Sequence, residues 1–523
     1  MGIYLNPDNE DFKMALNSEI YVDKSMLIAQ TNKVIRTEQR FVSVSRPRRF
    51  GKSMAANMLT AYYSLGCDSR EMFSGLKISK DKETFEKHLN KYNVIHVNMV
   101  DFMSEANDIT EMIGEVQKSL LFDLLEEFSD VRFYDSTKLE RSLRDIFAKH
   151  KIPFIFIIDE WDCIFREHKE DFDSQKIYLD FLRNLLKDKS YVALAYMTGI
   201  LPIKKYGKHS AINMFTEISM TNAEGYAEFT GFTEADVETL CKQYHMSFDE
   251  TKRWYDGYNL RGVSIYNPRS VVMSMTSHTF DNYWTSTETY EALKIYIQSE
   301  DMRDTINKLI SGEEIAIDTT TFVNDMVTFN SKDDVLTLLI HLGYLTYDFD
   351  TKRVSIPNYE ITEQFISTVR IIGWSEISDS LMRSDELLKS TIACDGEKVA
   401  ELIEQAHTEN ASILKYNDEN SLACVVSLAY YSARRTYTMY REVPAGKGYA
   451  DIIFIPRKNV TTPALVIELK YNQSAESAIT QIKNRHYTDF LKDYSGEILL
   501  VGINYDKDDP DKKHTCRIEK TKK

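Results

Sequence analysis

The pattern of apolar and polar positions divides the chain into three stretches. In the first stretch, four short runs rich in aliphatic and aromatic residues alternate with segments of helical spacing, which is typical of strands and helices in succession. The four runs are FVSVS (41–45), YNVIHVNMV (92–100), FIFIID (154–159) and YVALAYMTG (191–199). Because nearly every position in these runs is apolar, both faces of the sheet must be covered. The pattern therefore predicts an α/β fold with a doubly wound parallel sheet.

The second stretch has mostly helical spacing and two aromatic-rich segments, RWYDGYNL (253–260) and YNPRSVV (266–272). The aromatic rings of these segments are expected either to pack between helices or to stack on nucleobases, and packing is the more common role.

The third stretch has the element order α-β-β-β-α-β. It consists of a helix near 418–433, strands at 436–443, 449–456 and 463–471, an amphipathic helix at 474–492 and a strand at 497–505. The lysine-rich end after it is expected to fray. The three stretches predict an ATPase-like α/β domain at 1–225, a mainly helical middle domain at 226–395 and a smaller domain at 396–523.

Composition limits the class of protein. The 523 residues are 43% hydrophobic and 28% charged, with a net charge of −16. These proportions are typical of a folded globular protein, and the length suits several domains. The acidic balance argues against a protein that coats DNA, so any contact with nucleic acid must use a local basic surface.

The cysteines and the apolar runs bear on the compartment. The six cysteines form no CxxC pair, which fits a reducing environment without structural disulfides. The first residues lack a basic segment followed by an apolar one, and no apolar run approaches the ~18 residues that a membrane helix needs. We therefore expect a cytoplasmic protein with no membrane partner.

The segment after the first strand predicts a phosphate-binding loop. Residues 46–53 read RPRRFGKS, which fits the P-loop pattern GxxxxGK[ST] except that Arg46 stands at the first glycine. Gly51 lets backbone amides turn toward phosphates at a helix N-terminus, Lys52 reaches the β- and γ-phosphates, and the Ser53 hydroxyl can bind Mg²⁺. Arg46 and Arg49 are added to the nucleotide-binding residues. A basic loop before a helix is the alternative interpretation of this segment alone.

The third strand ends in the acid pair that a P-loop needs. Asp159 is expected to hold Mg²⁺, and Glu160 to orient or deprotonate the attacking water. Thr198, at the end of the fourth strand, is a candidate sensor of the γ-phosphate or an ordinary strand-end threonine.

These segments, together with YVDKS (21–25) and TGILPIKK (198–205), resemble the family of AAA-ATPase-like proteins common in anaerobic gut bacteria. In that family an arginine replaces the first P-loop glycine, as Arg46 does here. FTGFTEADV (229–237) and WYDGY (254–258) resemble its helical extension. The resemblance implies ATP binding and hydrolysis with Mg²⁺, and leaves open what the hydrolysis drives.

A second candidate site lies in the C-terminal stretch. Asp451 is on one predicted strand, and Glu468 and Lys470 are on the next. In Glu-x-Lys the two side chains share a face because the strand period is two, and a hairpin would bring Asp451 to them. Two carboxylates that hold a divalent metal beside a lysine form a site for phosphodiester hydrolysis. A solvated strand face is the alternative when the residues are taken singly.

The arrangement D-(x16)-E-x-K within α-β-β-β-α-β resembles the PD-(D/E)XK nuclease superfamily. The resemblance implies a metal-dependent nuclease with Mg²⁺ or Mn²⁺ at Asp451 and Glu468. Glu442, Gln481, Tyr487 and the acid Glu419 resemble supporting residues of that site. One departure is Tyr449, which stands where many relatives have arginine.

Two functions fit both motifs. The first is an ATP-regulated nuclease that cleaves nucleic acid, DNA rather than RNA, in defence or mobile-element biology. The second is a nucleotide-dependent switch whose nuclease-like domain binds a partner or nucleic acid without cleaving it. A motor on DNA is disfavoured, since the chain has no series of helicase motifs. A homo-oligomer is a candidate assembly under each function.

Overall fold

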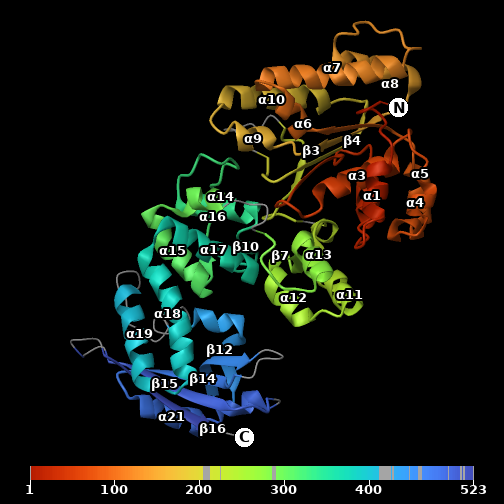
Figure 1. Cartoon of the computed structure of the whole chain (residues 1–523). Helices are drawn as coiled ribbons and strands as arrows, with labels where there is room; N and C mark the ends of the chain where they lie inside the picture. Colours follow the sequence, from red (N-terminus) through yellow and green to blue (C-terminus); the bar gives the residue numbers. More distant parts are fainter. Residues whose placement is uncertain are drawn as a thin grey trace. The chain divides into compact units, whose positions relative to one another are not determined.

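The computed structural model describes residues 2–203, 212–223, 225–284, 290–410, 426, 429–446, 448–456, 462–492, 494–506, 509 and 513–521. The chain forms two compact units, Met1–Glu288 with Glu314–Thr362 and Thr289–Glu313 with Glu363–Lys523 (Figure 1). The domain boundaries at 225/226 and 395/396 stay predictions.

The first unit is built on a parallel five-stranded sheet. Its strands are β1 (Phe41–Ser45), β2 (Asn93–Asn98), β3 (Phe154–Asp159), β4 (Val192–Gly199) and β5 (Thr216–Ile218). They lie in the order β2-β3-β4-β1-β5, and every pair is parallel. The predicted parallel α/β sheet is confirmed, with β5 as a strand that the apolar pattern did not predict.

Helices cover both faces of this sheet. Their bounds are α1 (Glu10–Leu16), α2 (Met26–Val34), α3 (Lys52–Tyr63), α4 (Arg70–Ser74), α5 (Lys82–His88), α6 (Met99–Glu105), α7 (Ile109–Glu127), α8 (Leu139–His150), α9 (Cys163–Glu167) and α10 (Phe172–Leu186), with the 3-10 helix η1 (Lys77–Lys80). In Figure 1, α7, α8 and α10 lie on one side of β3 and β4, and α3 lies on the other. Every residue of β1, β3 and β4 is buried, as two-sided covering requires.

The rest of the first unit is mixed. It contains η2 (Ala227–Phe229), α11 (Glu234–Tyr244), α12 (Phe248–Tyr255), α13 (Pro268–Ser277) and α16 (Lys332–Leu342). Two small antiparallel sheets accompany them, β6-β8-β7 (Phe232–Thr233, Val263–Tyr266, Tyr258–Leu260) and β10-β11-β9 (Thr346–Asp348, Arg353–Ser355, Ile315–Ala316). Tyr255, Tyr258 and Tyr266 are fully buried, so these rings pack in the core and offer no face to a nucleobase.

The second unit centres on a mixed sheet in the order β12-β13-β14-β15-β16. The strands are β12 (Tyr437–Ala445), β13 (Gly448–Pro456), β14 (Ala464–Tyr471), β15 (Ile498–Tyr505) and β16 (His514–Thr521). Only β14 and β15 pair in parallel among these described strands. The helices of this unit are α14 (Tyr290–Ile297), α15 (Glu300–Ser311), α17 (Tyr359–Ile372, which begins in the first unit), α18 (Ser375–Ile392), α19 (Gly396–Asn410), η3 (Tyr431–Arg435), α21 (Ala475–Asn484) and η4 (Tyr487–Leu491).

Two apolar layers hold this sheet. One layer packs Leu402 and Ile403 of α19 against Ile467 and Leu469 of β14. The other packs Ile479 and Ile482 of α21 against the opposite face. The C-terminal unit is thus a sheet with helices on both faces, as the predicted α-β-β-β-α-β order implies.

Two elements of the predicted C-terminal order are wrong. The segment 514–521 is strand β16, paired with β15 along its length, and not a frayed tail. Its charged side chains suit an edge strand, because only alternate residues such as Cys516 and Ile518 face the core. The helix expected at 474–492 is interrupted at His486, whose φ of 55° is left-handed. Most of the helix expected near 418–433 lies outside the described residues.

Within the described part of the chain, no helix is long and apolar enough to cross a bilayer.

Candidate active sites

The P-loop lies at the carboxyl edge of the parallel sheet. Gly51 precedes α3 with a φ of +82°, a conformation that residues with a Cβ rarely adopt, and Arg49 is also left-handed with a φ of 67°. These two turns lead the chain from the end of β1 into the 12-residue helix α3. Such a helix N-terminus attracts phosphate because its amides lack intrahelical partners.

The loop borders a cavity of about 840 Å³. Arg49, Gly51, Lys52, Ser53 and Glu160 all line it. The Ser53 hydroxyl is on an exposed residue at the start of α3, whereas Lys52 is only 5% exposed. The structure therefore brings five of the predicted nucleotide-site residues to one cavity.

Arg46 has a different position. Its side chain is fully buried, and it does not line the cavity. Its Nε donates to Thr230 Oγ1 at 3.0 Å and its Nη1 to the Ser45 carbonyl at 2.9 Å. Burial lowers the pKa of Arg46 to about 10. The guanidinium thus anchors the start of the loop to the segment around Thr230, and it does not face the cavity where phosphates would lie.

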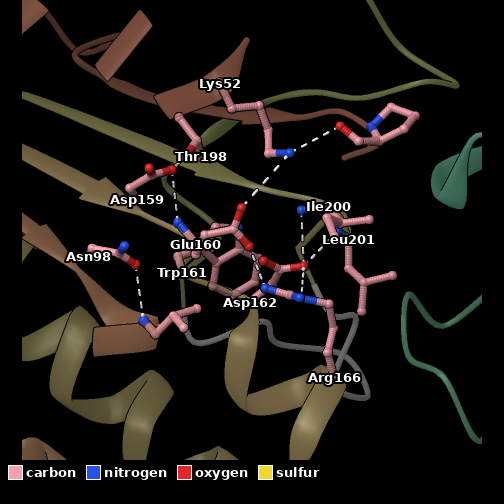
Figure 2. A network of polar contacts seen from close by, with 12 residues as sticks. Lys52, Asn98, Asp159, Glu160, Trp161, Asp162, Arg166, Thr198, Ile200 and Leu201 are labelled. Carbon is pink, nitrogen blue, oxygen red and sulfur yellow. Dashed lines mark hydrogen bonds and ion pairs between the residues drawn. The ribbon is translucent and has the colours of Figure 1, made fainter. Parts of the chain in front are cut away.

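Lys52 and Arg166 lie on opposite sides of the Glu160 carboxylate (Figure 2). Lys52 Nζ is 3.9 Å from Glu160 Oε1 and donates to the Pro47 carbonyl at 3.0 Å. Arg166 Nη2 donates to Glu160 Oε2. Burial raises the pKa of Glu160, and Lys52 opposes that rise. Burial lowers the pKa of Lys52, and Glu160 opposes that fall. Each charge is therefore stabilised mainly by its neighbour.

Asp159 is fixed in orientation at the end of β3. Its Oδ1 accepts hydrogen bonds from the Thr198 hydroxyl and from the Glu160 amide, the latter at 3.0 Å. Because β3 and β4 are parallel neighbours, the Thr198 side chain reaches Asp159 directly. The structure brings the predicted pair Asp159 and Glu160 together with Thr198, whose hydroxyl donates to Asp159.

Two further residues of this network, Asp162 and Arg166, are not expected from the sequence motifs. Asp162 is fully buried, and its Oδ2 accepts from the backbone amides of Ile200 and Leu201 at 3.0 and 2.7 Å. Arg166 Nε lies 3.3 Å from the same oxygen. Burial alone would lower the pKa of Arg166, but Asp162 and Glu160 more than offset this and raise it. The sequence does contain a signal for this ion pair. Asp162 and Arg166 follow the acid pair and are four residues apart, a spacing that places two side chains together on one helical turn.

The second site lies where β13 and β14 stop pairing. Ile452 pairs with Ile467 as the last partners in the ladder, and the next residues are Asp451 and Glu468. Asp451 Oδ2 accepts the Leu469 amide at 2.7 Å, so the side chain takes the place of a ladder hydrogen bond. Lys470 Nζ donates to Glu468 Oε1 at 2.7 Å. The three residues predicted from the spacing are brought together.

Gln481 and Tyr487 complete the polar cluster. Gln481 of α21 donates to Glu468 Oε1 and, at 3.1 Å, to the Tyr487 hydroxyl. Glu468 is 2% and Lys470 is 7% exposed, so both side chains are almost entirely shielded from solvent. Two of the four supporting residues that the resemblance implied thus contact the site, Gln481 directly and Tyr487 through Gln481.

The other supporting residues differ. Glu442 has a φ of 48° and an exposed side chain, and it lies opposite Asp451 between the pairs Arg441–Ile452 and Val443–Ala450. Tyr449, at the position of departure from the family pattern, is 64% exposed. Glu419 lies outside the described residues.

Glycine shapes the hairpin that carries Asp451. Gly446 has a φ of +56°, and a Cβ there would lie 2.1 Å from the Arg485 carbonyl oxygen and 2.5 Å from that of His486. The turn between β12 and β13 thus rests directly on the segment between α21 and η4. No side chain fits between them.

Replacing Gly446 with alanine is therefore expected to lower the free energy of unfolding of the C-terminal unit by about 1–3 kcal/mol. Thermal unfolding followed by circular dichroism measures the change. Gly114→Ala is the matched control, because Gly114 lies inside α7 with open space around it. Equal stability of the two variants would contradict the proposed strain.

Both sites contain donors suited to a hard divalent cation. Ser53 with Asp159, and Asp451 with Glu468, supply hydroxyl and carboxylate oxygens, the ligands that Mg²⁺ prefers. Among the described residues no cluster of three or more His, Cys, Asp or Glu side chains suits a metal. Two protein ligands at each site fit Mg²⁺, which usually keeps several waters and binds substrate phosphates.

Two protein-family models match parts of the chain. Residues 10–208 match a model described as predicted AAA-ATPase, and residues 417–515 match the PD-(D/E)XK nuclease superfamily. The chain carries an AAA-ATPase-like domain and a PD-(D/E)XK superfamily domain. The P-loop network lies within the first match, and the Asp451–Glu468–Lys470 cluster lies within the second.

Curated relatives of the chain are distant. An uncharacterized protein in the vnfD 5′ region of Azotobacter chroococcum is 25% identical over 280 residues, covering 51% of each chain. O-phosphoserine–tRNA(Cys) ligase of Methanococcus maripaludis is 31% identical over 107 residues, covering 18% of this chain and 20% of the ligase. The matched regions thus span about half or less of these relatives.

Solved structures are similar at a low level. A Walker-type ATPase of Pyrococcus abyssi has 12% identity and a TM-score of 0.35, covering 65% of this chain and 94% of that chain. The ORC2 protein of Aeropyrum pernix has 11% identity and a TM-score of 0.31, covering 70% and 92%. Similarities this low support no conclusion about function.

Proposed function

We propose that this protein binds and hydrolyses ATP and that its PD-(D/E)XK domain cleaves phosphodiester bonds of nucleic acid with a divalent metal. The observation that carries the proposal is the meeting of Asp451, Glu468 and Lys470 at the end of the β13–β14 ladder. A solvated strand face would leave such side chains exposed, whereas Glu468 and Lys470 are nearly buried and joined.

In the ATPase-like domain, the amides after Gly51 and the Lys52 ammonium would hold the phosphates of ATP. The Lys52 ammonium has three N–H donors, so it could donate to phosphate oxygens beside its contact with the Pro47 carbonyl. Ser53 and Asp159 would hold Mg²⁺, which when bound neutralises charge on the phosphates. Glu160 would orient and deprotonate the attacking water, with Arg166 holding the carboxylate in place. Thr198 would keep Asp159 oriented.

In the nuclease-superfamily domain, Asp451 and Glu468 would hold Mg²⁺ or Mn²⁺, which when bound lowers the pKa of water and stabilises charge on the phosphate. Lys470 would position the attacking water, and Gln481 would hold Glu468 in place. Water would attack phosphorus while the phosphorus–oxygen ester bond to the leaving strand breaks.

The biological setting is inferred from the same features. An acidic chain with one small nuclease site suits regulated cleavage of DNA, in defence or mobile-element biology, better than bulk coating. Scattered cysteines favour the cytoplasm, and a homo-oligomer is a candidate assembly because P-loop enzymes often receive an arginine in trans.

A cleavage assay tests the proposal. Single- and double-stranded DNA and RNA are incubated with the full chain, with Mg²⁺ or Mn²⁺ and with or without ATP. Cleavage is expected to need metal and to disappear in Glu468→Ala. Lys52→Ala is expected to alter cleavage only in reactions that contain ATP.

The matched control for this assay is Glu476→Ala, an exposed acid of α21. Cleavage that persists in Glu468→Ala would overturn the site. ATP binding without cleavage of any substrate would instead favour the nucleotide-dependent switch, in which this domain only binds.

A further inference from the structure

The nuclease-superfamily domain carries an exposed pair of aromatic rings. Tyr440 of β12 and Phe490 of η4 meet edge to face, with ring centroids 5.4 Å apart and an interplanar angle of 69°. The two residues are 39% and 36% exposed. Other large rings of this unit, such as Tyr430 and Phe454, are fully buried. Exposed aromatic rings are the side chains on which unpaired nucleobases stack.

The pair lies on the same face of the sheet as the Glu468 carboxylate. Tyr440 pairs with Ile453, and opposite residues of antiparallel strands share a face. Ile453 packs with Ile482 of α21, and α21 also supplies Gln481 to Glu468. Both the aromatic pair and the carboxylate therefore belong to the α21 face.

The two rings are close in sequence to residues of the site. Phe490 follows Tyr487 by three residues on the same 3-10 helix, and Tyr487 contacts Gln481. Tyr440 precedes Glu442 by two residues on β12, and Glu442 lies opposite Asp451. Tyr440 and Phe490 thus lie two and three residues along the chain from Glu442 and Tyr487.

The segment around Phe490 carries charged side chains of both signs. Arg485 and Lys492 are basic and exposed, and Asp489 is acidic and exposed. Asp493 follows Lys492 in the sequence, so the positive and negative charges balance along the segment. Arg485 and Lys492 are the two cations there that nucleic-acid phosphates could contact.

We propose that Tyr440 and Phe490 form a base-stacking platform that makes single-stranded nucleic acid the preferred ligand of this site. The proposal rests on the proposed nuclease function and names its substrate class. In a duplex each base is covered by its neighbours in the stack, so only an unpaired base can lie on an aromatic ring. Aromatic rings accept any base face, so the platform selects for strandedness and not for sequence.

The test separates binding from cleavage. Fluorescence anisotropy of a labelled single-stranded DNA oligonucleotide and of its duplex is measured with the full chain in EDTA. Wild type is expected to bind the single strand more tightly. Tyr440→Ala with Phe490→Ala is expected to weaken single-strand binding on the order of tenfold or more, and duplex binding by less than twofold.

Two further variants control for folding and for aromatic character. Tyr440→Phe with Phe490→Tyr keeps both rings and is expected to keep single-strand binding within about twofold. Tyr134→Ala removes a ring that is 82% exposed in the other unit and is expected to change nothing. Circular dichroism checks that each variant is folded.

The outcomes separate this proposal from the proposed function. Equal loss of single-strand and duplex binding, or no loss of either, in the folded alanine variant would overturn the platform. A wild-type protein that binds no nucleic acid would also overturn the platform, and a protein ligand would then be favoured for the two rings. Cleavage that depends on Glu468 would leave the nuclease proposal standing in any of these cases. Ring-dependent single-strand binding without any cleavage would support the platform and overturn the nuclease.

Discussion

Replacing Glu160 with glutamine is expected to slow ATP hydrolysis about a hundred- to ten-thousandfold while ATP binding is retained. The carboxylate is 3.9 Å from Lys52 Nζ and is held by Arg166, so its position at the nucleotide cavity is fixed. The amide has nearly the same shape but cannot accept a proton. Phosphate release measures hydrolysis, and a fluorescent ATP analogue measures binding.

The matched control for this prediction is Glu167→Gln. Glu167 lines the same cavity, but its side chain is exposed to solvent. Its replacement is expected to leave hydrolysis within about twofold of wild type, since surface substitutions have small effects. If Glu160→Gln hydrolyses ATP at the wild-type rate, the assignment of Glu160 as the group that activates water is wrong.

Replacing Asp451 with asparagine is expected to reduce metal-dependent cleavage on the order of a thousandfold. The substitution removes one of the two carboxylates that would hold the metal. The amide oxygen of asparagine can still accept the Leu469 amide, so the end of β13 is expected to keep its structure. Loss of activity in a folded variant would then report on the carboxylate charge itself. Gel analysis of a labelled substrate in Mg²⁺ and Mn²⁺ measures the rate.

Glu476→Gln is the control, because it removes an exposed carboxylate of the same domain. Excess Mn²⁺ is expected to restore part of the cleavage by Asp451→Asn, because a weakened site fills at higher metal concentration. Unchanged cleavage by Asp451→Asn in Mg²⁺ would place the metal elsewhere.

Local sequence predicted the elements that carry both sites. The strands at 41–45 and 154–159 match β1 and β3 residue for residue, because nearly continuous apolar runs have few other stable environments. The segment Gly51-Lys52-Ser53 predicted the turn into α3, because the left-handed backbone conformation at Gly51 suits glycine. The Glu468-x-Lys470 spacing predicted one shared face from strand period alone.

Long-range contacts decided what these residues touch. Arg46 was grouped with the nucleotide-binding residues, yet it bonds to Thr230, 184 positions away. Asp162 was overlooked because its partners are backbone amides of Ile200 and Leu201, which follow a different strand. Residues 514–521 looked like a charged tail because an edge strand needs only a few apolar residues once a neighbour supplies the hydrogen bonds.

The sequence by itself determined four strands of the first sheet, four strands of the C-terminal sheet, the phosphate-binding turn and the spacing of the acids and lysines. These features depend on backbone preferences and on apolar periodicity, which act over a few residues. The tertiary structure alone decided that Arg166 and Lys52 flank Glu160, that Gln481 holds Glu468, and that the rings of Tyr440 and Phe490 stay exposed together. Those contacts depend on which side chains from distant parts of the chain are buried together. A buried polar group needs a hydrogen-bond partner, and tertiary packing decides which partner is within reach.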